Sequence, residues 1–148
     1  MANVQIIVGS VMGTALEVAR TIEAVLEGYG HHVALNPAFQ AGDLGDDPDQ
    51  LLIICTSNTG MGDLPENIQP FHQHLVNDIP QVVDRRYVIV NLGDSSYPQF
   101  AQAGQTIDEA LADIGAKRIS TPLVIDAMEV DDHEDVAASW ATELNEII

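Results

Sequence analysis

Apolar residues along this chain occur in short continuous runs that alternate with stretches where they recur every three or four positions. The runs are typical of strands, and the other stretches are typical of helices with one inner face. Strands are expected over residues 4–8, 32–35, 51–56, 87–92 and 117–125. The inner helix faces are expected to hold Val18, Ala19, Ile22, Val25, Leu26 and Tyr29, then Ile68, Phe71, His72 and Leu75, then Ile107, Ala110, Leu111 and Ile114, and finally Val136, Trp140, Leu144 and Ile147.

Glycine and proline mark where these elements begin and end. Gly30 and Gly115 are expected to close the first and third helices, and Pro65 can open the second. Residues 37–50 are rich in Pro, Gly and Asp and lack a helical stripe, so a loop with at most one short turn is expected there. Pro122 has no backbone N–H, which places the last strand near an edge or makes it irregular.

Five strands that alternate with four helices predict an α/β fold, with an open parallel sheet covered by helices on both faces. The 148 residues are enough for one substantial core, and no repeat or linker divides them, so one domain over residues 1–148 is expected. The first strand is expected to lie between the second and the third, in the order 2-1-3-4-5. This order places the topological switch point between the loops that follow the first and third strands.

Three glycine-bearing segments each follow a predicted strand. They are Gly9-Ser10-Val11-Met12-Gly13-Thr14, Thr56-Ser57-Asn58-Thr59-Gly60-Met61-Gly62-Asp63, and Gly93-Asp94-Ser95-Ser96-Tyr97-Pro98-Gln99-Phe100. The carboxyl ends of parallel strands meet at one edge of a sheet, and ligands bind in the crevice there. The sequence therefore predicts one binding site built from three separate loops.

The first of these loops joins a strand to a helix N-terminus, where unpaired amides and the helix dipole attract an anion. Gly13 allows close backbone approach, and Ser10 and Thr14 offer hydroxyl donors. An alternative is a capping box formed by Thr14 and Glu17, which would satisfy the amides within the helix. The dinucleotide fingerprint and the lysine-bearing triphosphate loop are both absent. The spacing alone leaves the phosphate and capping interpretations open.

The chain is strongly acidic, with 23 Asp+Glu against five Lys+Arg and a formal net charge of −18. Such a field repels nucleic acid and anionic membranes and attracts basic partners. Solubility or adaptation to salt would also account for the charge. The apolar runs are too short to cross a bilayer, and the first residues are more typical of a strand than of a secretory signal, which favours the cytoplasm.

The single cysteine, Cys55, lies in an apolar run, so a buried inert thiol is favoured over a catalytic one. Neither an internal disulfide nor a cysteine-based zinc cluster is available to the chain. His31, His32, His72 and His74 lack a diagnostic spacing with carboxylates, and the Asp/Glu clusters lack the calcium-loop pattern. No metal site is predicted.

The third loop carries the most specific pattern. Tyr97 follows a strand end, where its ring can stack on a planar group for roughly 0.5–1.5 kcal/mol beyond area burial. Phe100 is more typical of the first core position of the next helix. The segment Gly93-Asp94-Ser95-Ser96-Tyr97-x-x-Phe100 resembles the flavin-contacting loop of flavodoxins, especially of the flavin mononucleotide (FMN) domains of diflavin reductases.

The other two loops extend this resemblance over essentially the whole chain. Thr56-Ser57 with Gly60-x-Gly62-Asp63 is similar to the second flavin loop of the family, and Ser10-x-x-Gly13-Thr14 stands where its phosphate loop belongs. The last strand shows no long insertion, which implies the short-chain type and a flavodoxin-like three-layer sandwich. The implied cofactor is FMN.

The resemblance also implies roles for individual residues. The phosphate would be wrapped by Ser10, Val11, Met12, Gly13, Thr14 and Ala15. The ring would be lined near its redox-active nitrogen by Asn58, Thr59, Gly60, Met61 and Gly62, and held on its other side by Gly93, Asp94 and Tyr97. The cofactor-binding set is completed by Thr56, Ser57, Asp63 and Phe100. In the family a peptide of the second loop flips when the ring is reduced, and Gly60 tolerates that flip.

An electron carrier is the leading functional hypothesis, since the redox chemistry belongs to the cofactor and requires no catalytic residue. Its implied partners are basic-faced redox proteins, such as a flavodoxin reductase and an acceptor enzyme, and the implied state is a monomer. Acidic charge near the ring would lower the flavin potential. Met12, Ala15 and Thr59 depart from the family pattern, and Ala101 replaces a cysteine common there. These departures predict weaker FMN binding than in a typical flavodoxin.

Two other functions remain alternatives. One is a flavin-dependent NAD(P)H/quinone reductase, although no second nucleotide site is evident in the sequence. The other is a flavin-free interaction module on the same fold. A signalling receiver is set aside, because the third strand ends in Ile54-Cys55-Thr56-Ser57 without the aspartate that receiver chemistry requires.

Overall fold

The computed structural model describes residues 2–10, 13–45, 47–57, 64–93, 102–126 and 132–148. The strands of its sheet are β1 (Asn3–Gly9), β2 (His32–Asn36), β3 (Leu51–Ser57), β4 (Arg86–Gly93), β5 (Lys117–Arg118) and β6 (Leu123–Asp126). The main helices are α1 (Thr14–Gly28), α2 (Gln69–Gln73), α3 (Gln102–Asp113) and α4 (His133–Asn145). All strand pairs are parallel, in the order β2-β1-β3-β4-β5 with β6 also on β4, so the predicted fold and strand order are confirmed.

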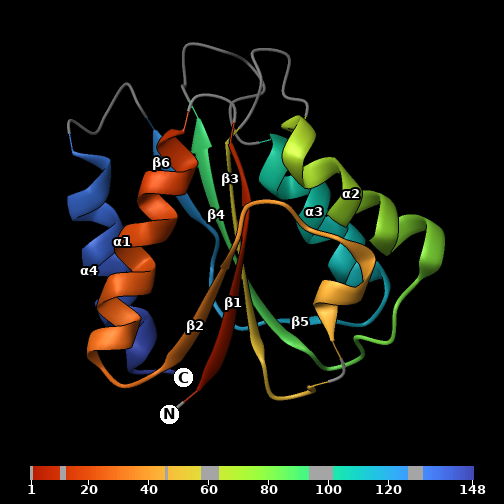
Figure 1. Cartoon of the computed structure of the whole chain (residues 1–148), viewed down its shortest axis with the longest axis horizontal. Helices are drawn as coiled ribbons and strands as arrows, with labels where there is room; N and C mark the ends of the chain where they lie inside the picture. Colours follow the sequence, from red (N-terminus) through yellow and green to blue (C-terminus); the bar gives the residue numbers. More distant parts are fainter. Residues whose placement is uncertain (1, 11–12, 46, 58–63, 94–101, 127–131) are drawn as a thin grey trace.

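Helices cover both faces of the sheet, as Figure 1 shows, with α1 and α4 on one side and α2 and α3 on the other. Alternation along each strand sends successive side chains to opposite faces. In β3, for example, Leu51, Ile53 and Cys55 join the core under α1 and α4, whereas Leu52 and Ile54 join the core under α2 and α3. The continuous apolar runs in the sequence therefore reflect strands that bury both faces.

The predicted inner faces are largely correct, but two terminal residues are not part of the core. Tyr29 is 51% exposed and Ile147 is 54% exposed. Because α1 ends at Gly28 and α4 ends at Asn145, both residues lie beyond the helices whose inner faces they were expected to extend. The core face of α4 is instead formed by Ala137, Ala141 and Leu144, with Trp140 only partly buried beside them. The small alanines allow α4 to pack closely against α1.

The helical segment that follows Pro65 is composite rather than one regular helix. A 3₁₀ turn, η2 (Glu66–Ile68), leads into α2, and a π-helical turn, η3 (His74–Asp78), ends the segment. Ile68, Phe71 and Leu75 are buried as predicted. His72 is only half-buried, so its assignment to the inner face is wrong in part.

Two irregular regions agree with the sequence. The 37–50 region contains only the short 3₁₀ helix η1 (Ala41–Leu44) among its described residues. The last strand is split into β5 and β6, with Pro122 between them. Within the described part of the chain, no helix is long and apolar enough to span a membrane.

Candidate functional site

The strands that precede the three glycine-bearing loops end at the same level of the sheet. Gly9 of β1 is paired with Thr56 of β3, and Thr56 is paired in turn with Asn91 of β4. The three chains therefore leave the sheet side by side at one edge, the upper edge in Figure 1. The predicted juxtaposition of the three loops at the carboxyl edge follows from this register.

Close packing beneath this edge requires a glycine at position 9. A Cβ added there would lie 2.7 Å from Ile68 Cγ2 and 2.7 Å from Thr56 Oγ1, inside van der Waals contact. Ile68 and Thr56 are both fully buried and have little room to move. Gly9 therefore lets the η2 turn, which follows the second loop, lie directly against the end of β1.

We expect Gly9→Ala to lower the free energy of unfolding by about 2 kcal/mol, because the new methyl group overpacks this contact. Gly42→Ala is the matched control, since a Cβ at Gly42 meets nothing within 4 Å, and it should change stability by less than about 0.5 kcal/mol. Denaturant unfolding of the three proteins measures both effects. Equal midpoints for Gly9→Ala and Gly42→Ala would contradict the packing argument.

The first loop turns into α1 through a left-handed glycine. Gly13 is the N-cap of α1 with φ of 89°, a conformation that a side chain would strain. Its N–H donates to Ser10 Oγ over 2.8 Å, and its carbonyl accepts the first helical bond, from the Glu17 N–H, over 3.0 Å. Thr14 therefore lies inside the helix, and the alternative Thr14–Glu17 capping box is wrong.

This geometry has the chemistry of an anion site. Because glycine has no side chain, the N-cap itself supplies no acceptor to the first amides of α1. Ser10 uses an oxygen lone pair to accept from Gly13, which leaves its hydroxyl proton available as a donor. The N-terminus of α1, with Ser10 and Thr14 beside it, thus fits a phosphate group. Val11 and Met12 lie outside the described residues.

Ala15 and Cys55 join the start of α1 to the sheet. Ala15 is fully buried and belongs to the core under α1 and α4. The Cys55 thiol donates to the Ala15 carbonyl over 3.4 Å. Complete burial raises the pKa of this thiol to about 12. The expected buried cysteine is confirmed.

The second loop is described only at its start. Thr56 is buried, and its hydroxyl donates to the Ser57 carbonyl over 3.0 Å. The Ser57 hydroxyl reaches back to the Gly9 carbonyl at 3.5 Å, which ties β3 to β1 at the site edge. The remaining predicted residues of this loop, Asn58, Thr59, Gly60, Met61, Gly62 and Asp63, lie outside the described residues.

The third loop is described at its two ends. Gly93 is the last residue of β4 and is paired with Asp126 of β6, while Asp94, Tyr97 and Phe100 lie outside the described residues. On the far side of the loop, the Gly104 N–H in the first turn of α3 donates to Asn91 Oδ1 over 2.5 Å. Asn91 thus anchors to β4 the helix that follows the loop, a contact that the sequence analysis missed.

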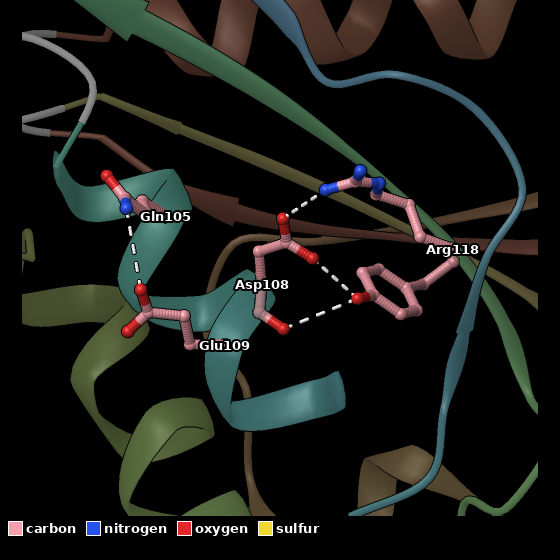
Figure 2. A network of polar contacts seen from close by, with 5 residues as sticks. Gln105, Asp108, Glu109 and Arg118 are labelled. Carbon is pink, nitrogen blue, oxygen red and sulfur yellow. Dashed lines mark hydrogen bonds and ion pairs between the residues drawn. The ribbon is translucent and has the colours of Figure 1, made fainter. Parts of the chain in front are cut away.

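A second anchor holds α3 to the sheet farther along (Figure 2). Asp108 accepts from the hydroxyl of Tyr87 on β4 and forms an ion pair with Arg118 on β5, while Gln105 and Glu109 interact along the same helix. Burial, followed by the bond to Asp108, raises the pKa of the Tyr87 hydroxyl. Together with Asn91, this network fixes how α3 lies against β4.

Asn67 is the described residue at this edge that the sequence analysis missed entirely. It lies in η2 and makes hydrogen bonds to Ser10, Val8 and Pro37. An asparagine two residues after a proline is also common in an ordinary helix start, so no signal in the sequence distinguished it. Among the described residues, no group of three or more His, Cys, Asp or Glu could hold a metal ion.

The family model described as flavodoxin matches residues 6–140. The chain belongs to the flavodoxin family. It is 37% identical to a protein named flavodoxin YqcA from Pectobacterium carotovorum, over 95% of this chain and 93% of that protein. A C101A mutant of a flavodoxin from Pseudomonas aeruginosa has a similar structure, with a TM-score of 0.88, 33% identity, and coverage of 96% of this chain and 95% of that one.

This flavodoxin also resembles part of a larger protein. It is 33% identical to the sulfite reductase [NADPH] flavoprotein alpha-component of Bacillus subtilis, over 93% of this chain but only 22% of that protein. The expected resemblance to the FMN domain of a diflavin reductase is thereby matched. The chain is an FMN-binding flavodoxin that functions in electron transfer, and the anion-binding geometry at Gly13 fits the phosphate of that cofactor.

Proposed function

We propose that this flavodoxin is a free electron carrier that moves electrons from a reductase to an acceptor enzyme and catalyses no reaction of its own. When bound, FMN supplies the redox chemistry, so the protein has to bind it, shield it and dock. The observation that supports this proposal best is the strand register. Gly9 is paired with Thr56 and Thr56 with Asn91, so the strands that precede the three loops end at one edge of the sheet. Similarity to flavodoxins along most of their length supports it further.

We assign the FMN contacts to the three loops. We assign phosphate binding to residues 10–15 and ring binding to residues 56–63 and 93–100. Within these segments, the contact residues are those predicted from the sequence. Support for the phosphate assignment comes from the left-handed Gly13 at the start of α1 and from the Ser10 hydroxyl, whose oxygen accepts from the Gly13 N–H and whose proton meets no acceptor among the described residues. Ala15 belongs to this set by the family resemblance alone, since the whole residue is buried.

The proposed partners are redox proteins with basic faces. We propose that the carrier is a monomer and that it functions in the cytoplasm. The distribution of cations supports this docking. Four of the five Lys and Arg residues lie at the amino ends of β4 and β5, the edge away from the three loops; they are Arg85, Arg86, Lys117 and Arg118. The large acidic excess of the chain is therefore least neutralised at the loop edge, which would steer a basic surface toward it.

FMN titration and NAD(P)H turnover test this proposal together. We expect apoprotein at micromolar concentration to quench flavin fluorescence with one FMN per chain, more weakly than a typical flavodoxin because of Met12, Ala15 and Thr59. We also expect the FMN-loaded protein to leave NAD(P)H unoxidised until a flavodoxin reductase is added. Oxidation of NAD(P)H with quinone by this protein alone would overturn the carrier assignment in favour of a quinone reductase.

A further inference from the structure

The end of β1 extends beyond the strand that pairs with it on one side. β2 pairs with β1 only as far as Asn36 opposite Ile7, and the chain then turns away at Pro37. The His32 N–H donates to the Ala2 carbonyl, so the backbone groups of even-numbered residues of β1 face β2. The carbonyl of Val8 and the N–H of Ser10 consequently point to the side where β2 has ended.

The side-chain amide of Asn67 takes the place of the missing strand. Its Oδ1 accepts from the Ser10 N–H over 3.0 Å, and its Nδ2 donates to the Val8 carbonyl over 3.1 Å. In a parallel ladder, a residue opposite residue 9 would accept from the N–H of residue 10 with its carbonyl and donate its N–H to the carbonyl of residue 8. Asn67 therefore reproduces the hydrogen bonds of a strand neighbour opposite Gly9.

The same amide holds a third segment. Nδ2 also donates to the Pro37 carbonyl over 2.9 Å, so one side chain connects the end of β1, the exit from β2 and the η2 turn. An asparagine amide has two donor hydrogens and one acceptor oxygen, and all three functions are used here. Aspartate has nearly the same shape but would bring a negative oxygen toward two carbonyl oxygens.

We propose that Asn67 is the positioning residue of the phosphate loop. Its bond to the Ser10 N–H satisfies that amide and fixes the backbone of Ser10. The Ser10 oxygen in turn holds Gly13 through the 2.8 Å bond from the Gly13 N–H. The Asn67–Ser10–Gly13 series of contacts pre-organises the N-terminus of α1, so that less ordering is required when the phosphate binds. This inference rests on the assignment of residues 10–15 to the FMN phosphate.

The test compares FMN with riboflavin, which carries the same ring but no phosphate. We expect Asn67→Ala to weaken FMN binding by roughly tenfold or more, since three hydrogen bonds are lost. Riboflavin binding should weaken by less than about threefold. Asn67→Asp should show the same selective loss for a second reason, the repulsion by the Val8 and Pro37 carbonyls. Gln69→Ala, which removes an exposed amide on the adjacent turn bonded only locally to Leu64, should leave both affinities unchanged.

Hydrogen exchange of the apoprotein gives a readout that does not involve flavin. The Ser10 amide should exchange at least about tenfold faster in Asn67→Ala than in the wild type, while amides in the middle of β3 keep their protection. Equal weakening of FMN and riboflavin, or an unchanged Ser10 exchange rate, would overturn the role of Asn67. If the wild type itself bound FMN no more tightly than riboflavin, the phosphate-loop assignment would be wrong and the inference would fail with it.

Discussion

Gly104→Ala is expected to lower the free energy of unfolding by about 3 kcal/mol and to weaken FMN binding. A Cβ at this position would lie 2.5 Å from Asn91 Oδ1 and 3.0 Å from Ile89 Cγ2, and both side chains are almost completely buried. The methyl group would overpack the interface between α3 and β4 and push away the oxygen that accepts from the Gly104 N–H. A buried amide without its acceptor adds a cost of its own.

The loss of FMN affinity follows from the position of Gly104 in the first turn of α3. This turn follows directly after the loop that carries Tyr97, so a shift of the helix relocates the end of that loop. Thermal unfolding of the apoprotein should show a midpoint lower by roughly 10 °C. FMN titration should show the weaker binding at a temperature where the variant is folded.

Gly28→Ala is the matched control for this experiment. Gly28 is also a helical glycine, at the end of α1, but a Cβ there meets nothing within 4 Å. Since alanine has a higher helix propensity, this change should be neutral or stabilising by up to about 1 kcal/mol. If Gly104→Ala behaved like Gly28→Ala, the close contact between Gly104 and Asn91 would not exist in solution.

The stability of the protein is expected to fall steeply at alkaline pH because of Cys55. Burial raises the pKa of its thiol from 9.0 to about 12 in the folded protein, while the unfolded chain ionises near 9. The stabilisation is therefore complete below pH 9 and is lost as the pH rises toward 12, where the unfolded state releases a proton that the folded state retains. At roughly 1.4 kcal/mol per pH unit, the loss by pH 10.5 is about 2 kcal/mol.

Cys55→Ala separates this contribution from that of Tyr87, whose pKa is raised in the same direction and which acts in the same alkaline range. The variant should be somewhat less stable than the wild type at pH 8, because it leaves a small cavity in the core. Between pH 8 and pH 10.5, however, it should lose about 2 kcal/mol less. Urea unfolding at the two pH values measures the difference. Parallel losses in both proteins would show that Cys55 ionises as readily in the folded state as in the unfolded state.

Much of the fold was predictable because the sheet is parallel and buried on both faces. The run Leu51–Cys55 is typical of a covered strand, since it is short, contains two isoleucines and is apolar on both faces. The alternation of strands and helices then limits the topology to a few arrangements with right-handed crossovers. Two of the errors fall at helix ends, where Tyr29 and Ile147 continue the apolar spacing although the helices have already stopped.

The sequence predicted at which edge of the sheet the candidate site would lie, but not the side-chain hydrogen bonds that hold its backbone in place. The strands that lead into the glycine-bearing loops were expected to end together at the carboxyl edge, because the sheet is parallel, and their register confirms this. The choice between a phosphate loop and a Thr14–Glu17 capping box required the backbone of Gly13, whose left-handed conformation makes it the N-cap. The spacing of three residues between Thr14 and Glu17 is compatible with both a phosphate loop and a capping box, so the sequence could not distinguish the two.

By itself, the sequence determined the layers of this protein, the order of its strands and the edge at which we propose its cofactor site. These features depend on the period of apolar residues and on strand direction, which are local or nearly local properties. Only the tertiary structure decided which polar side chains support the site. Asn67 replaces a missing strand beside Gly9, Asn91 on β4 holds the first turn of α3, and His31 joins Ala2 to Asn145. Each of these contacts joins residues that only the folded chain brings together, so no local pattern in the sequence could reveal them.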